Sequence, residues 1–289
     1  MDLSRHGQFR FGTSILVIPD AHARPDELPE DFDRFRAAGK LILDLKPEIV
    51  VCLGDLGDFD SLNQHKPKEE GSSYDGKALK RDVGAFKEAL KALMSPTRNA
   101  NKRHQNSRRK DRQWEPHKVF LEGNHEEFWR RYKETEFDGH DYLEKFVESE
   151  GWSWHRFLDP VDIRGVLFSH YFTTGVSRKP AGVGQILNKT HRSCVWGHTH
   201  SFGYNQAPVL GGGTIAALCA GSYKPPHRTG EHEWSGLTLL TNVDRGSFSI
   251  QQFPYDAVLE RYGEGDYAQQ LRVARANAYQ DHEDADNAF

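Results

Sequence analysis

The chain has 289 residues and a formal net charge of -4, with 37% hydrophobic and 28% charged residues. This balance is typical of a globular protein with enough apolar residues for a core, and it provides no overall attraction to nucleic acid. The longest apolar runs have the length of strands, far short of the ~20 residues that a membrane-spanning helix needs, so we expect no membrane partner.

Short apolar runs alternate with amphipathic stretches along the chain. Apolar residues at a helical period predict helices over 31–46, which Pro47 ends, and over 74–94. The strand-like runs lie at 15–18, 49–53, 119–121, 152–157, 161–169, 193–196, 213–218, 237–241 and 247–253. Alternation of this kind is typical of a layered α/β architecture, so we expect two sheets flanked by helices.

The segment at about 60–117 is longer than one helix and a loop require. It includes the stretch 98–112, which holds seven Lys or Arg residues against one Asp and is followed by Trp114. Two interpretations remain open: a solvated loop, or a basic flap that holds a polyanionic substrate. The second would make substrate-binding residues of Arg103, Arg108, Arg109 and Lys110.

The three cysteines, Cys52, Cys194 and Cys219, each lie in an apolar run. An odd count argues against a disulfide framework and indicates a reducing compartment. The first ten residues contain no apolar stretch of the signal-peptide type. We therefore expect a cytoplasmic protein, which would act in the host cytoplasm if a phage encodes it.

Polar residues suited to metal binding directly follow five of the apolar runs. In open α/β folds, binding and catalytic sites lie at the ends of the strands, so we expect these residues to lie close together in the folded protein. Mixed carboxylate, amide and imidazole donors without a thiolate favour Mn²⁺, Fe, Zn²⁺ or Ni²⁺ over a thiolate zinc site. The five segments are Asp20-Ala21-His22, Gly54-Asp55-Leu56-Gly57-Asp58, Gly123-Asn124-His125-Glu126, Ser169-His170-Tyr171 and Gly197-His198-Thr199-His200.

In this order, the five segments resemble the calcineurin-like metallophosphoesterase superfamily over roughly residues 13–245, and within it the nuclease-type and phage- or prophage-encoded enzymes. The resemblance implies an α/β fold, a four-layer sandwich of two mixed β-sheets flanked by helices. We expect this domain at 1–260, with the helix and basic loop at about 60–117 inserted into it. A C-terminal helix and acidic tail, partly flexible, would follow at 261–289.

The resemblance also implies two divalent ions, with Mn²⁺ favoured and Fe, Zn²⁺ or Ni²⁺ as alternatives. A bridging carboxylate, here Asp55, lets two ions lie about 3.5 to 4 Å apart. The paired ligands, Asp20 with His22 and His198 with His200, should lie on loops just past strand ends. One ion would be held by Asp20, His22, Asp55 and His200, and the other by Asp55, Asn124, His170 and His198.

Four further residues are assigned roles near the ions. In the family, the residue matching His125 protonates the leaving oxygen or stabilises charge on the transition state, an effect worth about 10² to 10⁴ in rate. Asp58 matches a carboxylate that pairs with this histidine, although it could instead cap the turn. Arg24 could bind a substrate phosphate or form a surface salt bridge. Tyr171 could stack on a base, narrow the site or pack in the core.

The resemblance implies hydrolysis of a phosphoester by a metal-bridging hydroxide, but the fold and ligands alone do not fix the substrate. Phe59 stands where protein phosphatases have a phosphate-binding Arg, and Gly-His-Thr-His is typical of diesterases and nucleases. We therefore expect a phosphodiesterase acting on nucleotides, DNA or RNA. The alternatives are a phosphomonoesterase for proteins or small molecules, and a non-catalytic binding protein of the same fold. The sequence does not indicate an oligomeric state.

Overall fold

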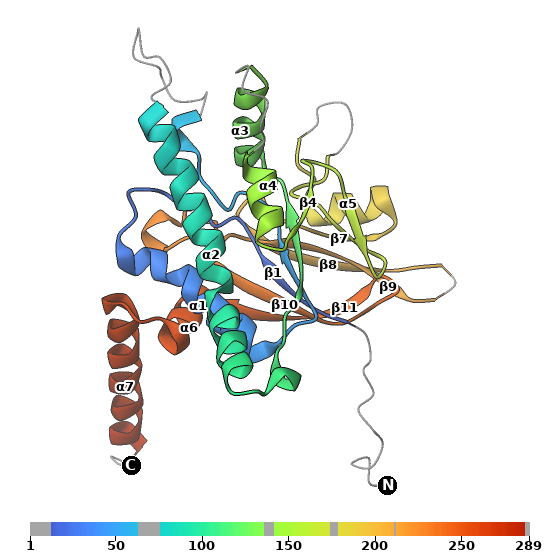
Figure 1. Cartoon of the computed structure of the whole chain (residues 1–289). Helices are drawn as coiled ribbons and strands as arrows, with labels where there is room; N and C mark the ends of the chain where they lie inside the picture. The colour runs from blue at the N-terminus through green and yellow to red at the C-terminus, as the bar shows by residue number, and fades with distance from the viewer. Residues whose placement is uncertain (1–12, 63–75, 136–141, 174–178, 211, 287–289) are drawn as a thin grey trace.

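The computed structural model describes residues 13–62, 76–135, 142–173, 179–210 and 212–286. Two mixed β-sheets form the centre of the fold (Figure 1). The first has the order β11-β10-β1-β2-β3-β4, in which β1 to β4 are parallel and β10 and β11 are antiparallel to their neighbours. Its strands are β1 Thr13–Ile18, β2 Ile49–Cys52, β3 His117–Leu121, β4 Ser153–His155, β10 Gly236–Asp244 and β11 Ser247–Pro254.

The second sheet has the order β5-β6-β7-β9-β8, in which β6, β7 and β9 are parallel and the two edge strands are antiparallel. The run predicted as one strand at 161–169 is a hairpin, because the chain turns at Arg164 and Gly165 with left-handed backbone. Strand β8 was not predicted. The strands are β5 Val161–Ile163, β6 Val166–Phe168, β7 Ser193–Trp196, β8 Phe202–Pro208 and β9 Thr214–Ala220.

Three apolar cores separate four layers, as the sequence predicts. Alternate residues of β1, β2 and β3, among them Val17 and Val51, pack against Val166 and Leu218 of the second sheet and form the middle core. The opposite face of the first sheet packs on α1, α2, α4 and α6, and that of the second sheet packs on α5. The helices are α1 Pro29–Leu45, α2 Gly76–Asn106, α3 Asn124–Thr135, α4 Tyr142–Ser149, α5 Val183–Thr190, α6 Tyr255–Tyr262 and α7 Asp266–Asp286.

Helices α1 and α2 pack closely on the outer face of the first sheet (Figure 1). A side chain at Gly39 of α1 would overlap the backbone of Leu93 in α2, so this close approach needs glycine. Helix α1 ends at Leu45 and is capped by Lys46, which has a left-handed φ of 48° and an N–H that donates to the Ile42 carbonyl, just before Pro47.

Helix α2 is longer than the sequence predicts. It has 31 residues, continues past Pro96 and contains much of the basic stretch that was expected to form a loop. Only residues 107–116 connect it to β3, and they include the short 3₁₀ helix η3, Lys110–Arg112. Asn101 fastens this connection, since its side chain accepts from the Trp114 N–H at 3.0 Å and donates to the Trp114 carbonyl at 2.8 Å.

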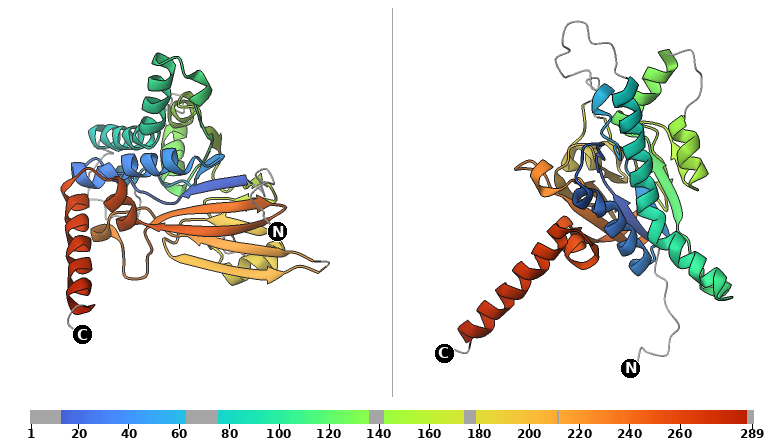
Figure 2. Two further views of the ribbon diagram at one scale, coloured as in Figure 1. Left: turned by 90° about the horizontal axis from the view of Figure 1, so that it is seen from below. Right: turned by 60° about the vertical axis from the view of Figure 1, so that its left-hand side comes forward.

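The C-terminal helix α7 extends away from the two sheets in both views of Figure 2. It is anchored to α6, where Arg275 pairs with Glu260 at 2.9 Å. Among the described residues, no helix has the length and apolar character to cross a membrane. The three cysteines are all buried and unpaired.

Candidate metal centre

The five polar segments converge at one end of the molecule. Each follows the carboxyl end of a parallel strand: β1, β2 and β3 in the first sheet, and β6 and β7 in the second. Because parallel strands end at the same edge of a sheet, their following loops meet there. The structure thus brings together all seven residues that the sequence assigns as metal ligands.

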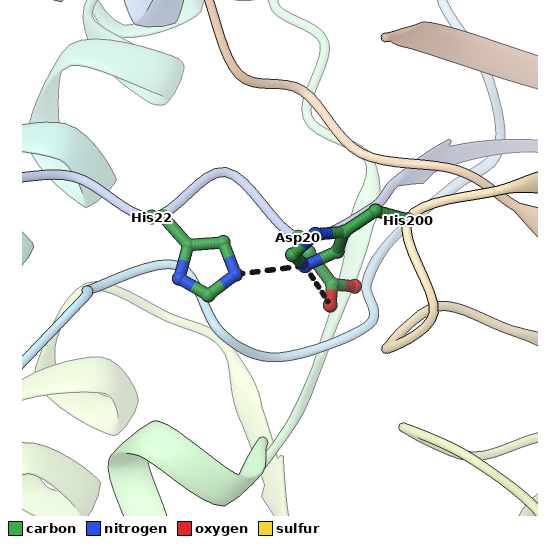
Figure 3. A group of neighbouring side chains, drawn as sticks. All are labelled: Asp20, His22 and His200. Atoms are coloured by element: carbon green, nitrogen blue, oxygen red, sulfur yellow. Dashed lines mark hydrogen bonds and ion pairs between the residues drawn. The ribbon is translucent and has the colours of Figure 1, made fainter. Parts of the chain in front are cut away.

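The first group consists of Asp20, His22 and His200, whose ligand atoms lie within 4.8 Å of one another (Figure 3). Nε2 of His200 lies 3.4 Å from Oδ2 of Asp20 and 3.0 Å from Nε2 of His22. The carboxylate of Asp20 is fully buried. The group therefore presents one carboxylate and two imidazole nitrogens to a common point.

The second group consists of Asp55, His170 and His198, and Asp55 also lies near His22 of the first group. Its Oδ2 is 3.3 Å from Nε2 of His170 and 3.9 Å from Nε2 of His22. Oδ1 of Asn124 lies 2.9 Å from both Nε2 of His170 and Nδ1 of His198. Asp55 is thus placed to be shared, as expected of a bridging carboxylate.

The donor set fits two divalent cations. Oδ1 of Asp20 is buried and has no hydrogen-bond partner, and such an atom is costly unless something binds it. The described ion pairs of Asp20 and Asp55 involve histidines only, without Lys or Arg. Burial raises the pKa of Asp55, but His170 and His125 lower it further, so the net pKa lies well below its usual range. Two buried anions surrounded by imidazole nitrogens are therefore suited to bind cations.

The loops that carry the ligands depart from ordinary backbone geometry. Positive φ values occur at His22 (49°), Asp55 (48°), His198 (68°) and His200 (57°). The left-handed conformation is unfavourable for non-glycine residues. It turns the chain sharply after β1, β2 and β7: Asp20 and His22 both reach the first ligand group, whereas His198 and His200 reach different groups.

Glu126 holds two of these loops together. It is fully buried and accepts hydrogen bonds from the N–H groups of Asp55 (2.8 Å), Gly57 (3.2 Å) and Gly123 (3.0 Å). Burial, together with the charge of Asp55, raises the pKa of Glu126 to about 7. A side chain at Gly123 would overlap Oδ1 of Asp55, so glycine is needed beside the central carboxylate.

His125 lies beside the second group with its ring facing the site. Its Nδ1 donates to the backbone carbonyl of Asp58, and its Nε2 is 3.9 Å from Oδ2 of Asp55. Burial lowers the pKa of His125, but Asp55 and the Asp58 carbonyl raise it, and the net pKa lies above the usual value.

The carboxylate of Asp58 lies within ion-pair distance of His125 but does not hydrogen-bond its ring. It lies 3.8 Å from the His125 ring and instead bonds Nδ1 of His22 at 2.9 Å and Nε of Arg24. The reason is geometric, since the Asp58 carbonyl already occupies Nδ1 of His125. Asp58 therefore orients a predicted ligand, His22, while its main chain orients His125.

Glu233 lies behind His200 and was not predicted. Its Oε1 is 2.9 Å from Nδ1 of His200, and its Oε2 is 2.7 Å from Nζ of Lys224. Burial raises the pKa of Glu233, but the hydrogen bond from Lys224 and further bonds lower it to about 2, which keeps the group anionic. A carboxylate behind a metal-binding histidine fixes its ring and tautomer.

Two residues assigned to substrate binding lie at the rim of the site. Tyr171 packs on His198, with ring centroids 4.5 Å apart and an angle of 32° between the planes. Arg24 pairs with Asp58 and has a side chain that is 37% exposed. Arg228, which was not predicted, donates to the carbonyl of His22 at 2.9 Å and pairs with Glu27.

The basic stretch lies at the other end of the sheet. Residues 107–116 lead into the first residue of β3, His117, whereas Asn124 follows the last. Five strand residues separate the two ends, which amounts to about 17 Å at ~3.3 Å per residue. The structure therefore does not bring Arg103, Arg108, Arg109 and Lys110 to the candidate ligands, and a flap over the site does not fit this placement.

No family model and no curated protein matches the chain. Among solved structures, YfcE, a phosphoesterase from E. coli, aligns with 84% of this chain and 99% of its own, at 14% sequence identity and a TM-score of 0.37. A second structure aligns with 83% of this chain and 99% of its own, at 12% identity and a TM-score of 0.36. Similarities this low do not assign a family or an activity.

Proposed function

We propose that the chain is a two-metal phosphoesterase that hydrolyses phosphodiesters, with nucleotides or nucleic acid as substrates. The observation that carries the proposal is the position of Asp55, whose Oδ2 lies 3.3 Å from Nε2 of His170 in its own group and 3.9 Å from Nε2 of His22 in the other. Buried carboxylates, an amide oxygen and imidazoles favour a hard or borderline divalent ion, and we infer Mn²⁺, with Fe, Zn²⁺ and Ni²⁺ as alternatives. Asp20, His22, Asp55 and His200 would hold one ion, and Asp55, Asn124, His170 and His198 the other.

Two ions held by these residues would supply Lewis acidity and would lower the pKa of a water molecule bound to them. The protein supplies the proton for the leaving oxygen through His125. Because Nδ1 of His125 donates to the Asp58 carbonyl, its Nε2 faces the site and can carry a proton toward the substrate. Asp58 holds His22 and Arg24 in place, and Arg24 provides a cationic donor at the rim for a phosphate oxygen.

The test compares hydrolysis of bis(p-nitrophenyl) phosphate and p-nitrophenyl phosphate by protein reloaded with Mn²⁺, alongside measured metal content. We expect the diester to be cleaved faster, and Asp55→Asn to abolish both activities. Faster cleavage of the monoester would instead support a phosphomonoesterase. Protein that binds two ions yet cleaves neither compound would overturn the proposal in favour of a binding protein.

A further inference from the structure

A groove adjoins the candidate metal centre between the start of α1 and the first half of α2. It consists of two neighbouring cavities of about 530 and 270 Å³, and Arg24, Pro25 and Arg81 line both. Phe32 and Glu88 add to the lining of the larger cavity. Arg81 belongs to α2, in the segment at about 60–117 that the sequence marks as an insertion.

The groove is connected to the candidate metal centre through Asp58. One oxygen of Asp58 bonds Nε of Arg24 in the groove, and the other bonds Nδ1 of His22 at 2.9 Å. The opposite nitrogen of His22, Nε2, points to the first ligand group. A phosphoester bound at that group therefore lies close enough to extend a substituent past Arg24.

The guanidinium of Arg81 is available for a ligand. Arg81 is exposed, and among the described residues it has no hydrogen bond or ion pair. Glu27, an acid on the wall of the larger cavity, already binds Arg34 and Arg228. Arg24 and Arg81 therefore stand against Glu27 and Glu88 in the larger cavity, whose lining is neutral, and Arg81 is its one cation without a partner among the described residues.

The smaller cavity differs in charge. Asp26, Asp60 and Asp82 line it together with the same two arginines, so it is less suited to an anion. Asp82 is buried and bonds the hydroxyl and the N–H of Ser61. The charge balance thus favours the larger cavity for a negatively charged group.

We propose that the larger cavity binds a second phosphate group of the substrate, between Arg24 and Arg81. A guanidinium matches two phosphate oxygens at once, and Phe32 and Pro25 provide an apolar wall for the sugar or base beside it. The proposal rests on the proposed function, since it assumes that the first phosphate lies at the metal centre. It narrows the substrates to those with at least two phosphates, either along a nucleic-acid backbone or in a nucleotide polyphosphate.

The test measures binding by calorimetry with Mn²⁺-loaded protein. The ligands are thymidine 5′-monophosphate, thymidine 3′,5′-bisphosphate and thymidine 5′-diphosphate. Wild-type protein should bind at least one of the two ligands with a second phosphate more tightly than the monophosphate. Arg81→Ala should reduce that preference by about 10- to 100-fold, as expected for a lost charge-assisted contact. Lys80→Ala is the matched control, because Lys80 is the exposed neighbour of Arg81 on α2 and lines neither cavity.

The ligand whose affinity depends on Arg81 identifies the source of the second phosphate: the bisphosphate indicates a nucleic-acid backbone, and the diphosphate indicates a nucleotide polyphosphate. Equal affinity for all three ligands, or a preference that Arg81→Ala leaves intact, would overturn the second-phosphate site. Hydrolysis of bis(p-nitrophenyl) phosphate, which has one phosphate, should be the same in wild type and Arg81→Ala. Because binding is measured without turnover, failure of the proposed hydrolysis and failure of this site give different results.

Discussion

Glu233 and Lys224 compete for the same nitrogen of His200. Oε1 of Glu233 lies 2.9 Å and Nζ of Lys224 lies 3.0 Å from Nδ1 of that ring. If Nδ1 donates to Glu233, Nε2 keeps a lone pair for an ion. If Nδ1 accepts from Lys224, Nε2 of a neutral ring carries the proton and cannot be a ligand. Ligation of an ion by Nε2 of His200 therefore depends on the contact between Nδ1 and the Glu233 carboxylate.

We expect Glu233→Ala to weaken binding of one of the two ions by about 10- to 100-fold, the usual effect of removing a group that orients a ligand. Mn²⁺ titration by calorimetry should show one weakened and one unchanged site. Glu231→Ala provides the control, since Glu231 is exposed on the same loop. Unchanged binding of both ions in Glu233→Ala would contradict the assigned role.

Asp55 should be the most sensitive ligand, because it belongs to the second group and also lies near His22 of the first. We expect elemental analysis of reloaded protein to find two ions per chain, and Asp55→Asn to retain fewer. The substitution preserves size but removes the charge that would be shared by both ions. Two tightly held ions in this variant would show that the bridge is misassigned.

Replacing His125 with alanine should lower turnover by about 10² to 10⁴ while leaving the metal content near normal. The residue would act on the leaving oxygen, so the loss should shrink for activated aryl esters that need little protonation. Comparing rates on aryl diesters with leaving groups of graded pKa tests this dependence. A variant that loses an ion would identify His125 as a ligand.

The distance between the basic stretch, 98–112, and the candidate metal centre can be tested. Neutralising Arg103, Arg108, Arg109 and Lys110 together should leave oligonucleotide cleavage and its salt dependence unchanged, because these residues lie about one strand length from the site. A salt dependence that flattens by roughly one log–log unit per lost phosphate contact would show that the substrate reaches them. Cleavage of a small aryl diester serves as the folding control.

The sequence predicts the layers and the ligand set because both depend on local patterns. Apolar runs define the buried strands, and polar residues directly after them mark the strand ends. Strand β8 is not predicted by this pattern because it is a half-exposed edge strand without a continuous apolar run. It also contains Gly203, Asn205 and Pro208, residue types that are rare in strands. The extent of α2 was underestimated because Pro96 and the basic residues after it suggest a helix end.

Residues that act through others leave no comparable signal. Glu233 and Arg228 reach the site from the connection between β9 and β10, and nothing in the sequence around them distinguishes them from surface charges. The sequence marks Asp58 as a residue of the site, but it does not show that the backbone carbonyl of Asp58 bonds His125 while its carboxylate bonds His22. Such contacts follow from tertiary structure alone, since their partners are distant in sequence.

The stability of the folded chain should depend on the ion supply, because four of the candidate ligands have left-handed backbone: His22, Asp55, His198 and His200. Each such residue costs on the order of 1 to 3 kcal/mol, and bound ions offset this cost only in the folded state. Mn²⁺ should raise the unfolding temperature, and each bound ion should add about 2.7 kcal/mol to the free energy of unfolding at a hundredfold excess over its Kd. In a cell short of the ion, the loops would open more often to proteases, so scarcity would reduce the amount of protein as well as its activity.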